Sequence, residues 1–175
     1  MSQLIMNWKN NGKEVSFPSA PSGCAIVRFT ELEGAVDKWL DIVQYGLSNG
    51  RMDEKYYHDV MTSRENYRED KCFFILENGE AVATVAILCN YEKKEGYIHM
   101  VACKESFRGK GYGTLLNKIC EYVLKSEGME SAHLTTDDWR IPAIKSYLRA
   151  GFEPVTEGED FPERWEKIFE IIKEK

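Results

Sequence analysis

The sequence predicts an α/β fold of the α+β kind, in which helices flank a central, mixed and mostly antiparallel sheet. Three segments, 71–76, 81–90 and 96–103, read as strands, and Asn78-Gly79 between the first two is a strong signal for a tight hairpin. These strands form an antiparallel meander. An amphipathic helix then leads to a further strand at 131–135. A strand reached through a helical crossover lies parallel to its predecessor, so the sheet is mixed.

The other segments add shorter strands and helices around this sheet. We expect short strands at 4–8, 24–30 and 152–156. We expect helices over 34–47, from a cap at Asp53, from Tyr112 to a stop at Gly128, over 140–149 and over 161–175.

Length and composition describe an ordinary globular chain. Its 175 residues suit one domain, 1–175, with 43% hydrophobic and 30% charged residues. The net charge of −6 makes nucleic acid an unexpected partner. No apolar run approaches the roughly 20 residues of a membrane span, and the first residues lack the pattern of a signal peptide. We therefore expect no membrane association.

The cysteines indicate a reducing compartment. There are five of them, an odd number, and none forms a Cys-x-x-Cys pair. This pattern argues against a disulfide framework and against a zinc site, so we expect no metal and a cytoplasmic location.

The segment from Tyr97 to Cys103 is the predicted central strand. Side chains of a strand alternate between its two faces, and this alternation predicts two sets. Ile98, Met100 and Ala102 are expected on one side, and His99, Val101 and Cys103 on the other.

A basic, glycine-rich turn, Arg108–Gly113, follows this strand and opens the next helix. Glycines let a ligand approach the backbone, and a helix start offers unpaired N–H groups and the positive end of a dipole. With the charges of Arg108 and Lys110, the turn predicts a phosphate site; the alternative is a solvated loop. The Walker pattern fails because Lys110 is followed by Gly111, and the dinucleotide fingerprint lacks its third glycine.

The pattern that does fit is Arg108-x-x-Gly111-x-Gly113, placed after a strand and at the start of a helix. At this point the sequence resembles the GNAT family of N-acetyltransferases, in which this loop holds the pyrophosphate of coenzyme A.

A second segment, 134–152, resembles the other signature of that family. Ala143, Tyr147 and Gly151-Phe152 occur at the family's spacings, whereas Arg140 stands where the family usually has Asn. The two segments cover about a third of the chain. The family usually ends in a longer hairpin, so a helix over 161–175 departs from its pattern.

The resemblance implies a GNAT fold in which the central strand and the next parallel strand splay apart. It implies acetyl-CoA as the co-substrate, whose pantetheine pairs with the freed backbone. The implied cofactor-binding residues are Val101, Ala102, Cys103, Arg108, Gly109, Lys110, Gly111, Tyr112, Gly113, Thr114 and Arg140. Arg140 either contacts phosphates or faces solvent. Cys103 is expected to be a small buried residue and not a nucleophile.

The resemblance also places Tyr147 as the general acid. The leaving thiolate belongs to a thiol of pKa about 8.5, so protonation assists its departure near pH 7. The alternative is a tyrosine that packs in the core.

The attacking amine must be neutral, which makes a general base useful. Holding an amine of pKa about 10.4 neutral at pH 7 costs about 4.6 kcal/mol, whereas an α-amine of pKa about 7.8 costs only about 1 kcal/mol. His99, on the central strand, is the candidate base; the alternative is a half-buried histidine bonded to a neighbour.

The expected function is transfer of an acetyl group from acetyl-CoA to a primary amine of a small molecule or peptide, by direct attack in a ternary complex. One alternative is a non-catalytic acyl-CoA-binding module with a regulatory or interaction role. A second is a phosphate-binding α/β domain without acyl chemistry. The identity of the amine stays open, and a homodimer is compatible with the sequence.

Overall fold

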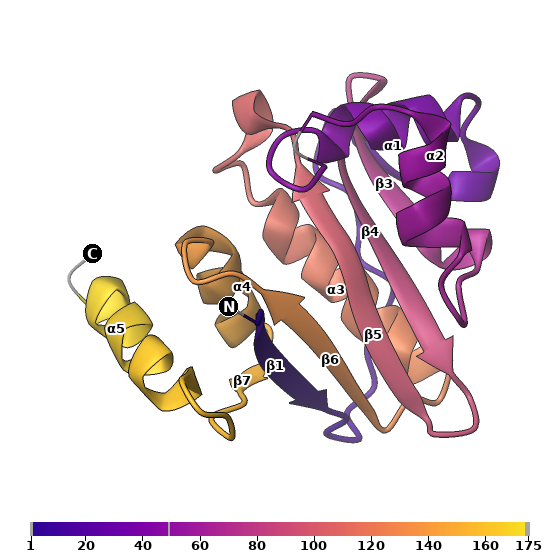
Figure 1. Ribbon diagram of the computed structural model, residues 1–175. Helices are drawn as coiled ribbons and strands as arrows, with labels where there is room; N and C mark the ends of the chain where they lie inside the picture. The colour runs from indigo at the N-terminus through magenta and orange to yellow at the C-terminus, as the bar shows by residue number, and fades with distance from the viewer. Residues whose placement is uncertain (1, 49, 174–175) are drawn as a thin grey trace.

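A computed structural model of the chain describes residues 2–48 and 50–173. Its centre is a seven-stranded sheet with the order β2-β3-β4-β5-β6-β1-β7 (Figure 1). The strands are β1 Leu4–Lys9, β2 Cys24–Arg28, β3 Cys72–Glu77, β4 Glu80–Asn90, β5 Glu95–Cys103, β6 Ser131–Thr136 and β7 Glu153–Pro154.

Helices cover both faces of this sheet (Figure 1). They are α1 Ala35–Val43, α2 Glu54–Tyr57, α3 Tyr112–Ser126, α4 Ile141–Arg149 and α5 Phe161–Lys173. Side chains of α1 and α2 form one hydrophobic cluster with one face of the sheet. Side chains of α3, α4 and α5 form a second cluster on the opposite face. We call these the α1/α2 face and the α3/α4 face.

The predicted meander and parallel crossover are confirmed. Strands β3, β4 and β5 pair antiparallel, and β5 pairs parallel to β6 after the crossover through α3. The β5–β6 pairing runs from Glu95 opposite Ser131 to Ile98 opposite Leu134. It ends there, although β5 continues to Cys103 and β6 to Thr136. The ends of the two strands point apart, which is the expected splay (Figure 1).

The predicted alternation of side chains along β5 is wrong in its second half. Between His99 and Ala102 the strand holds two residues opposite the single Val85 of β4, so it contains a β-bulge. Met100 lies in the bulge with φ of 53°, a left-handed conformation that β-branched and most other residues avoid. The extra residue exchanges the faces of every side chain beyond it.

Several element ends also differ from expectation. The strand expected over 24–30 stops at Arg28 and continues as a 3₁₀ turn, and the helix expected over 34–47 is α1, Ala35–Val43. Asp53 does cap α2, since its side chain accepts a hydrogen bond from the N–H of Tyr56. That helix changes after one turn into a π-helical segment, His58–Thr62.

The first and the last strand of the chain pair at one edge of the sheet. The strand expected over 152–156 is reduced to Glu153–Pro154 and pairs with β1, which lies between it and β6. The predicted C-terminal helix is confirmed as α5 over residues 161–173; residues 174–175 lie outside the described part. Among the described residues, no helix is both long and apolar enough to cross a membrane.

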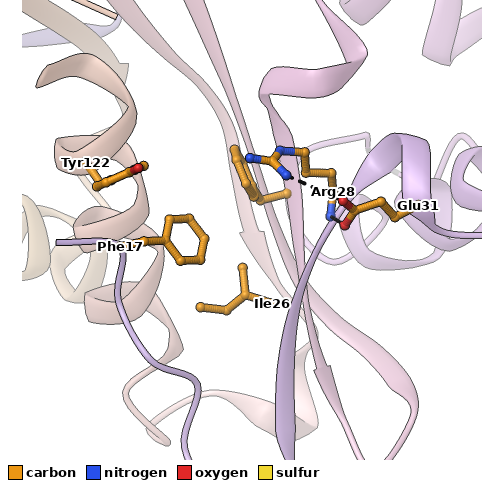
Figure 2. Close-up of a pocket in the computed structure, with 6 residues that line it drawn as sticks. Phe17, Ile26, Arg28, Glu31 and Tyr122 are labelled. Carbon is orange, nitrogen blue, oxygen red and sulfur yellow. Dashed lines mark hydrogen bonds and ion pairs between the residues drawn. The ribbon is translucent and has the colours of Figure 1, made fainter. Parts of the chain in front are cut away.

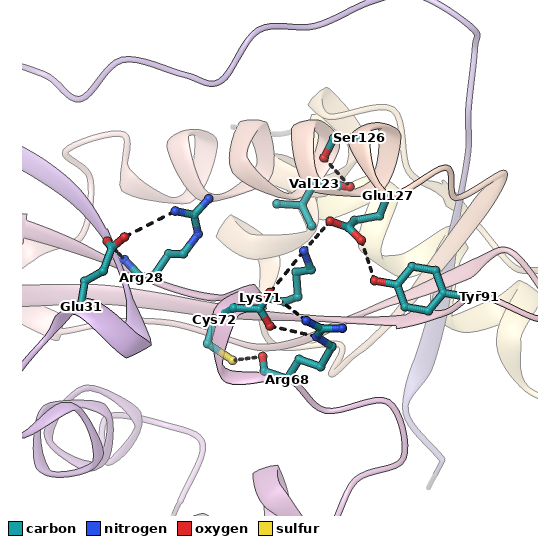
Figure 3. Close-up of polar contacts among 10 residues, drawn as sticks. Arg28, Glu31, Arg68, Lys71, Cys72, Tyr91, Val123, Ser126 and Glu127 are labelled. Carbon is teal, nitrogen blue, oxygen red and sulfur yellow. Dashed lines mark hydrogen bonds and ion pairs between the residues drawn. The ribbon is translucent and has the colours of Figure 1, made fainter.

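A polar cluster ties the start of β3 to the end of α3 (Figure 3). The ammonium of Lys71 contacts the carboxylate of Glu127, and the hydroxyl of Tyr91 donates to the same carboxylate at 2.5 Å. The Lys71 side chain is only 16% exposed, so these contacts compensate for the partial loss of its hydration. The cluster anchors the far end of α3, away from the glycine loop.

Helix α5 is part of the core, which makes a direct prediction about stability. Trp165 is 1% exposed and donates its indole N–H to the carbonyl of Val155 at 3.0 Å. We expect Trp165→Ala to lower the free energy of unfolding in urea by about 3–5 kcal/mol through the cavity it leaves. Ile171→Ala on the exposed side of the same helix is the control, with an expected change within about 0.5 kcal/mol. Equal losses for both variants would contradict a buried α5.

Candidate functional site

The site is organised around the backbone of β5 beyond its last pairing with β6. Arg140, in the loop after β6, extends a guanidinium N–H toward the carbonyl oxygen of Val101 at 3.4 Å. A residue of that loop can reach this carbonyl only if the carbonyl faces the opening between the strands. Backbone polar groups in such an opening lack a ladder partner and are free to pair with an extended ligand.

The glycine turn stands at the end of this opening and starts α3. Gly111 is the N-cap of α3 with φ of 87°, a conformation that glycine adopts without strain. A Cβ placed there meets nothing within 4 Å, so the space over the turn is open. Gly113 has a different role, because its Cβ would lie 3.4 Å from the Oγ of Ser146. It lets α3 and α4 approach each other.

The two cations of the turn already have partners. Arg108 donates to the carbonyl of Tyr45 at 2.8 Å, and the ammonium of Lys110 lies 2.9 Å from a carboxylate oxygen of Glu77. Both side chains are on the surface, where such pairs contribute little and exchange readily for a phosphate. Thr114 is exposed, whereas Tyr112 is 5% exposed and points into the core, so it offers only its backbone N–H.

Tyr147 lies buried in α4 on the α3/α4 face. Its side chain is 4% exposed, and its ring packs edge-on against Phe152. Burial raises its pKa to about 12, and the positive charge of Arg140 opposes that rise. Transfer of its proton to a thiolate whose acid has a pKa of about 8.5 is therefore uphill. As an acid for a thiolate, the phenol needs a nearby positive charge.

His99 lies buried on the opposite face. Its Nε2 is 2.8 Å from the carbonyl of Val60, a distance at which the ring N–H donates, so Nδ1 carries the free lone pair. Burial lowers the pKa of the ring, which is therefore neutral at pH 7. Tyr97 stacks between His99 and His133, with ring centroids 5.3 and 4.8 Å apart. This row leads from His99 to the half-exposed His133.

The expected grouping of His99 with Val101 and Cys103 is wrong because of the bulge. Val101 and Cys103 pack against the cluster on the α3/α4 face, whereas the partner of His99, Val60, belongs to the α1/α2 face. In the structure, Tyr147 and His99 lie on opposite faces of the central strand, with the opening between them. Burial also raises the pKa of the Cys103 thiol, as expected of a protonated, unreactive cysteine.

Thr136, the last residue of β6, carries a polar group that sequence reasoning missed. It is 1% exposed, and within the described chain its hydroxyl has no hydrogen-bond partner. Burying a hydroxyl without a partner is unfavourable by about 1–3 kcal/mol. Thr136 lies two residues beyond Leu134, where the pairing with β5 ends. An unpartnered buried hydroxyl at this end of β6 fits a ligand that carries an amide, as coenzyme A does.

The loop between β6 and α4 is held by α5, which sequence reasoning also missed. Arg164, 8% exposed, donates two hydrogen bonds to the carboxylate of Asp138, at 2.9 and 2.5 Å. Trp139, next in the loop, lies 3.8 Å from a Cβ placed on Gly46. The sequence does contain a signal for this contact. Arg164 lies on the apolar side of a helix, and a buried guanidinium requires a carboxylate partner.

Two open pockets lie outside the opening between β5 and β6. The larger, of about 340 Å³, is bounded by Phe17 and Tyr122 on one side and by Arg28 and Glu31 on the other (Figure 2). Tyr122 is 11 residues along α3 from Gly111, or about 16 Å, so this pocket is remote from the glycine turn. The second, of about 230 Å³, includes Tyr97 and His133 and lies on the α1/α2 face. Among the described residues, no group of His, Cys, Asp or Glu could hold a metal.

Comparison with known proteins gives a consistent result. The model of the acetyltransferase (GNAT) family matches residues 37–152, which is more than half of the chain. The chain belongs to this family.

Among its relatives is an uncharacterized N-acetyltransferase, MJ1207, of Methanocaldococcus jannaschii. The two are 40% identical over 113 residues, which cover 57% of this chain and 50% of the relative. The match therefore spans only half of that protein's length.

Two solved structures share the fold. A GCN5-related N-acetyltransferase from Sphaerobacter thermophilus has a TM-score of 0.69 at 19% identity, over 89% of this chain and 50% of that one. The ribosomal-protein-S18-alanine N-acetyltransferase of Escherichia coli has a TM-score of 0.59 at 20% identity, over 76% and 79% of the two chains. At these identities the likeness concerns the fold.

Thr136 gives a prediction in which stability and ligand affinity change in opposite directions. Thr136→Val keeps the side-chain shape and removes the unpaired hydroxyl. We expect the free energy of unfolding without ligand to rise by about 1 kcal/mol, and the affinity for coenzyme A to fall roughly fivefold. Urea unfolding and calorimetric titration measure the two effects. A change of both quantities in the same direction would be inconsistent with a hydroxyl reserved for the ligand.

His99 gives a prediction about pH. Because its pKa is lowered in the folded state, the unfolded chain binds the proton first as pH falls below 6.5. The contribution of His99 to stability is thus full above pH 6.5 and is lost progressively below it. We expect the wild type to lose more unfolding free energy between pH 7.5 and 5.5 than His99→Gln, which still has an N–H for Val60. Identical losses would show that the ring is not held neutral.

Proposed function

We propose that this chain transfers an acetyl group from acetyl-CoA to a primary amine of a small molecule or peptide, by direct attack in a ternary complex. The observation that carries the proposal is the opening between β5 and β6. A glycine turn and helix start stand at its end, Tyr147 lies on one face and His99 on the other. A thioester held in the opening is accessible to an amine from the α1/α2 face, while its sulfur lies toward the α3/α4 face.

Different groups of the chain bind different parts of the cofactor. Backbone N–H groups of 109–114, with Arg108 and Lys110, hold the pyrophosphate. The freed backbone of Val101, Ala102 and Cys103 pairs with the pantetheine, and one N–H there stabilises the negative charge that develops on the thioester oxygen. The cofactor supplies an activated acyl group; the protein supplies orientation and charge.

The two faces of the opening serve different parts of the reaction: His99 takes the amine proton on one face, and Tyr147 contacts the sulfur on the other. The amine nitrogen forms a bond to the acyl carbon, and the carbon–sulfur bond breaks with its electron pair on sulfur. The nitrogen gives up its extra proton to Nδ1 of His99 through water, and the hydroxyl of Tyr147 donates a hydrogen bond to the sulfur. His99 then releases its proton to solvent, and the departing thiolate takes a proton from water.

The lowered pKa of His99 affects which acceptor amines the site can deprotonate. A weak base removes a proton readily from an α-amine of pKa about 7.8, and poorly from a lysine-like amine of pKa about 10.4. Acceptors with amines near pKa 8 therefore fit this site best. An α-amino group of a peptide or small molecule has this property.

The experiment is a calorimetric titration with acetyl-CoA, with ATP and desulfo-CoA as comparison ligands. Gly111→Asp and Gly111→Asn form a matched pair, since both side chains tolerate the left-handed conformation and both find open space. They differ only in charge. We expect Asp to bind acetyl-CoA roughly tenfold or more weakly than Asn, because the carboxylate would face the pyrophosphate.

The outcomes separate the possible functions. Acetylation of an amine library that falls roughly 100-fold in Tyr147→Phe supports the enzyme. Binding without transfer to any amine would leave the non-catalytic acyl-CoA-binding module. Equal affinities for the Asp and Asn variants, or binding of ATP in place of acetyl-CoA, would rule out the proposed cofactor site.

A further inference from the structure

We propose that Arg140 is a catalytic residue that stabilises the leaving thiolate of coenzyme A, and does not bind the phosphates. The inference rests on the proposed function, because it requires coenzyme A in the opening between β5 and β6. It assigns a task to the residue that stands where the family usually has Asn, and it concerns the sulfur end of the cofactor.

The first support is the position of the guanidinium. Arg140 precedes α4 and extends its side chain to the carbonyl of Val101, in the middle of the freed backbone of β5. The cations of the glycine turn behave differently, since Arg108 and Lys110 contact Tyr45 and Glu77 at the surface. Arg140 is thus at the part of the opening where the thioester is expected. The 3.4 Å bond to Val101 is long, so it is readily exchanged for a stronger, charged partner.

The second support is the raised pKa of Tyr147, which makes this phenol a poor proton donor to a thiolate. Burial raises the pKa of this phenol, the positive charge of Arg140 lowers it, and Cys120 and Tyr97 add to the rise. A buried phenol that holds its proton tightly can donate a hydrogen bond to sulfur but is a poor source of a proton. A permanently charged guanidinium beside it stabilises the thiolate without a proton transfer.

The third support is the way in which Arg140 is held. Its guanidinium lies 5.7 Å from the ring centroid of Trp139, in a cation–π contact. The preceding Asp138 is fixed to α5 by the two hydrogen bonds from Arg164. A side chain mounted on such a loop loses little further freedom when it binds an anion, which is the condition for effective charge stabilisation.

In this step the carbon–sulfur bond breaks and its electron pair stays on sulfur as a thiolate. Arg140 contributes positive charge, and Tyr147 contributes a hydrogen bond while keeping its proton. The amine proton leaves on the other face, toward His99. The thiolate is protonated by water as coenzyme A departs, so no further reactant is needed.

The test measures the pKa of the thiol of bound coenzyme A, from the ultraviolet absorbance of its thiolate, and needs no acceptor amine. We expect the wild type to lower this pKa by about 1 unit or more below its free value of about 8.5, which is a tenfold larger thiolate fraction at neutral pH. Arg140→Gln should abolish most of that shift, and Arg140→Lys should retain much of it. Arg149→Gln, on the exposed end of α4, is the control and should behave as the wild type.

Desulfo-CoA binding, measured in parallel, separates this inference from the proposed function. We expect its affinity in Arg140→Gln to stay within about threefold of the wild type, because that ligand has no thiol to stabilise. A bound thiol whose pKa is the same in wild type and Arg140→Gln would overturn the role of Arg140 while leaving the cofactor site intact. A large loss of desulfo-CoA affinity would also overturn it, in favour of phosphate or pantetheine binding. Failure of all these proteins to bind coenzyme A would instead refute the proposed function.

Discussion

The site depends on one constraint, the end of pairing between β5 and β6 at Ile98 and Leu134. Two parallel strands that continue without pairing leave backbone groups that neither strand satisfies. Unpaired N–H and C=O groups inside a protein are costly, so such an opening is stable only where something else occupies it. In this molecule the guanidinium of Arg140 reaches one of these groups, the carbonyl of Val101, at 3.4 Å.

The bulge at Met100 decides which face the last side chains of β5 take. Without the extra residue, Val101 and Cys103 would lie on the α1/α2 face with His99. With it, they pack on the α3/α4 face, from which Tyr147 of α4 also projects, while the imidazole lies under the π-helical segment after α2. The left-handed conformation of Met100 is strained, and such strain is retained where a site requires it. The proposed attack from one face and departure toward the other use this arrangement.

Local patterns in the sequence predicted the parts that depend on local structure. The Asn78-Gly79 turn, the glycine turn before α3 and the spacing between Tyr147 in α4 and Gly151 just after it are properties of short segments. They identified the meander, the crossover and the family. The bulge could not be predicted in this way, because it depends on the register between β4 and β5. The hydrogen bond from Arg140 to Val101 joins residues 39 positions apart and has no local signature. Arg164 did carry a signal, as a charge on the apolar side of α5.

The most direct measurement of the central claim is amide hydrogen exchange along β5, followed with and without acetyl-CoA. We expect acetyl-CoA to slow exchange over 99–103 and at the start of α3, and to leave the paired residues 95–98 unchanged. Exchange over 99–103 that is unaffected by saturating acetyl-CoA, with slowing instead around Phe17 and Tyr122, would contradict a cofactor site between β5 and β6 and place the ligand in the pocket at the far part of α3.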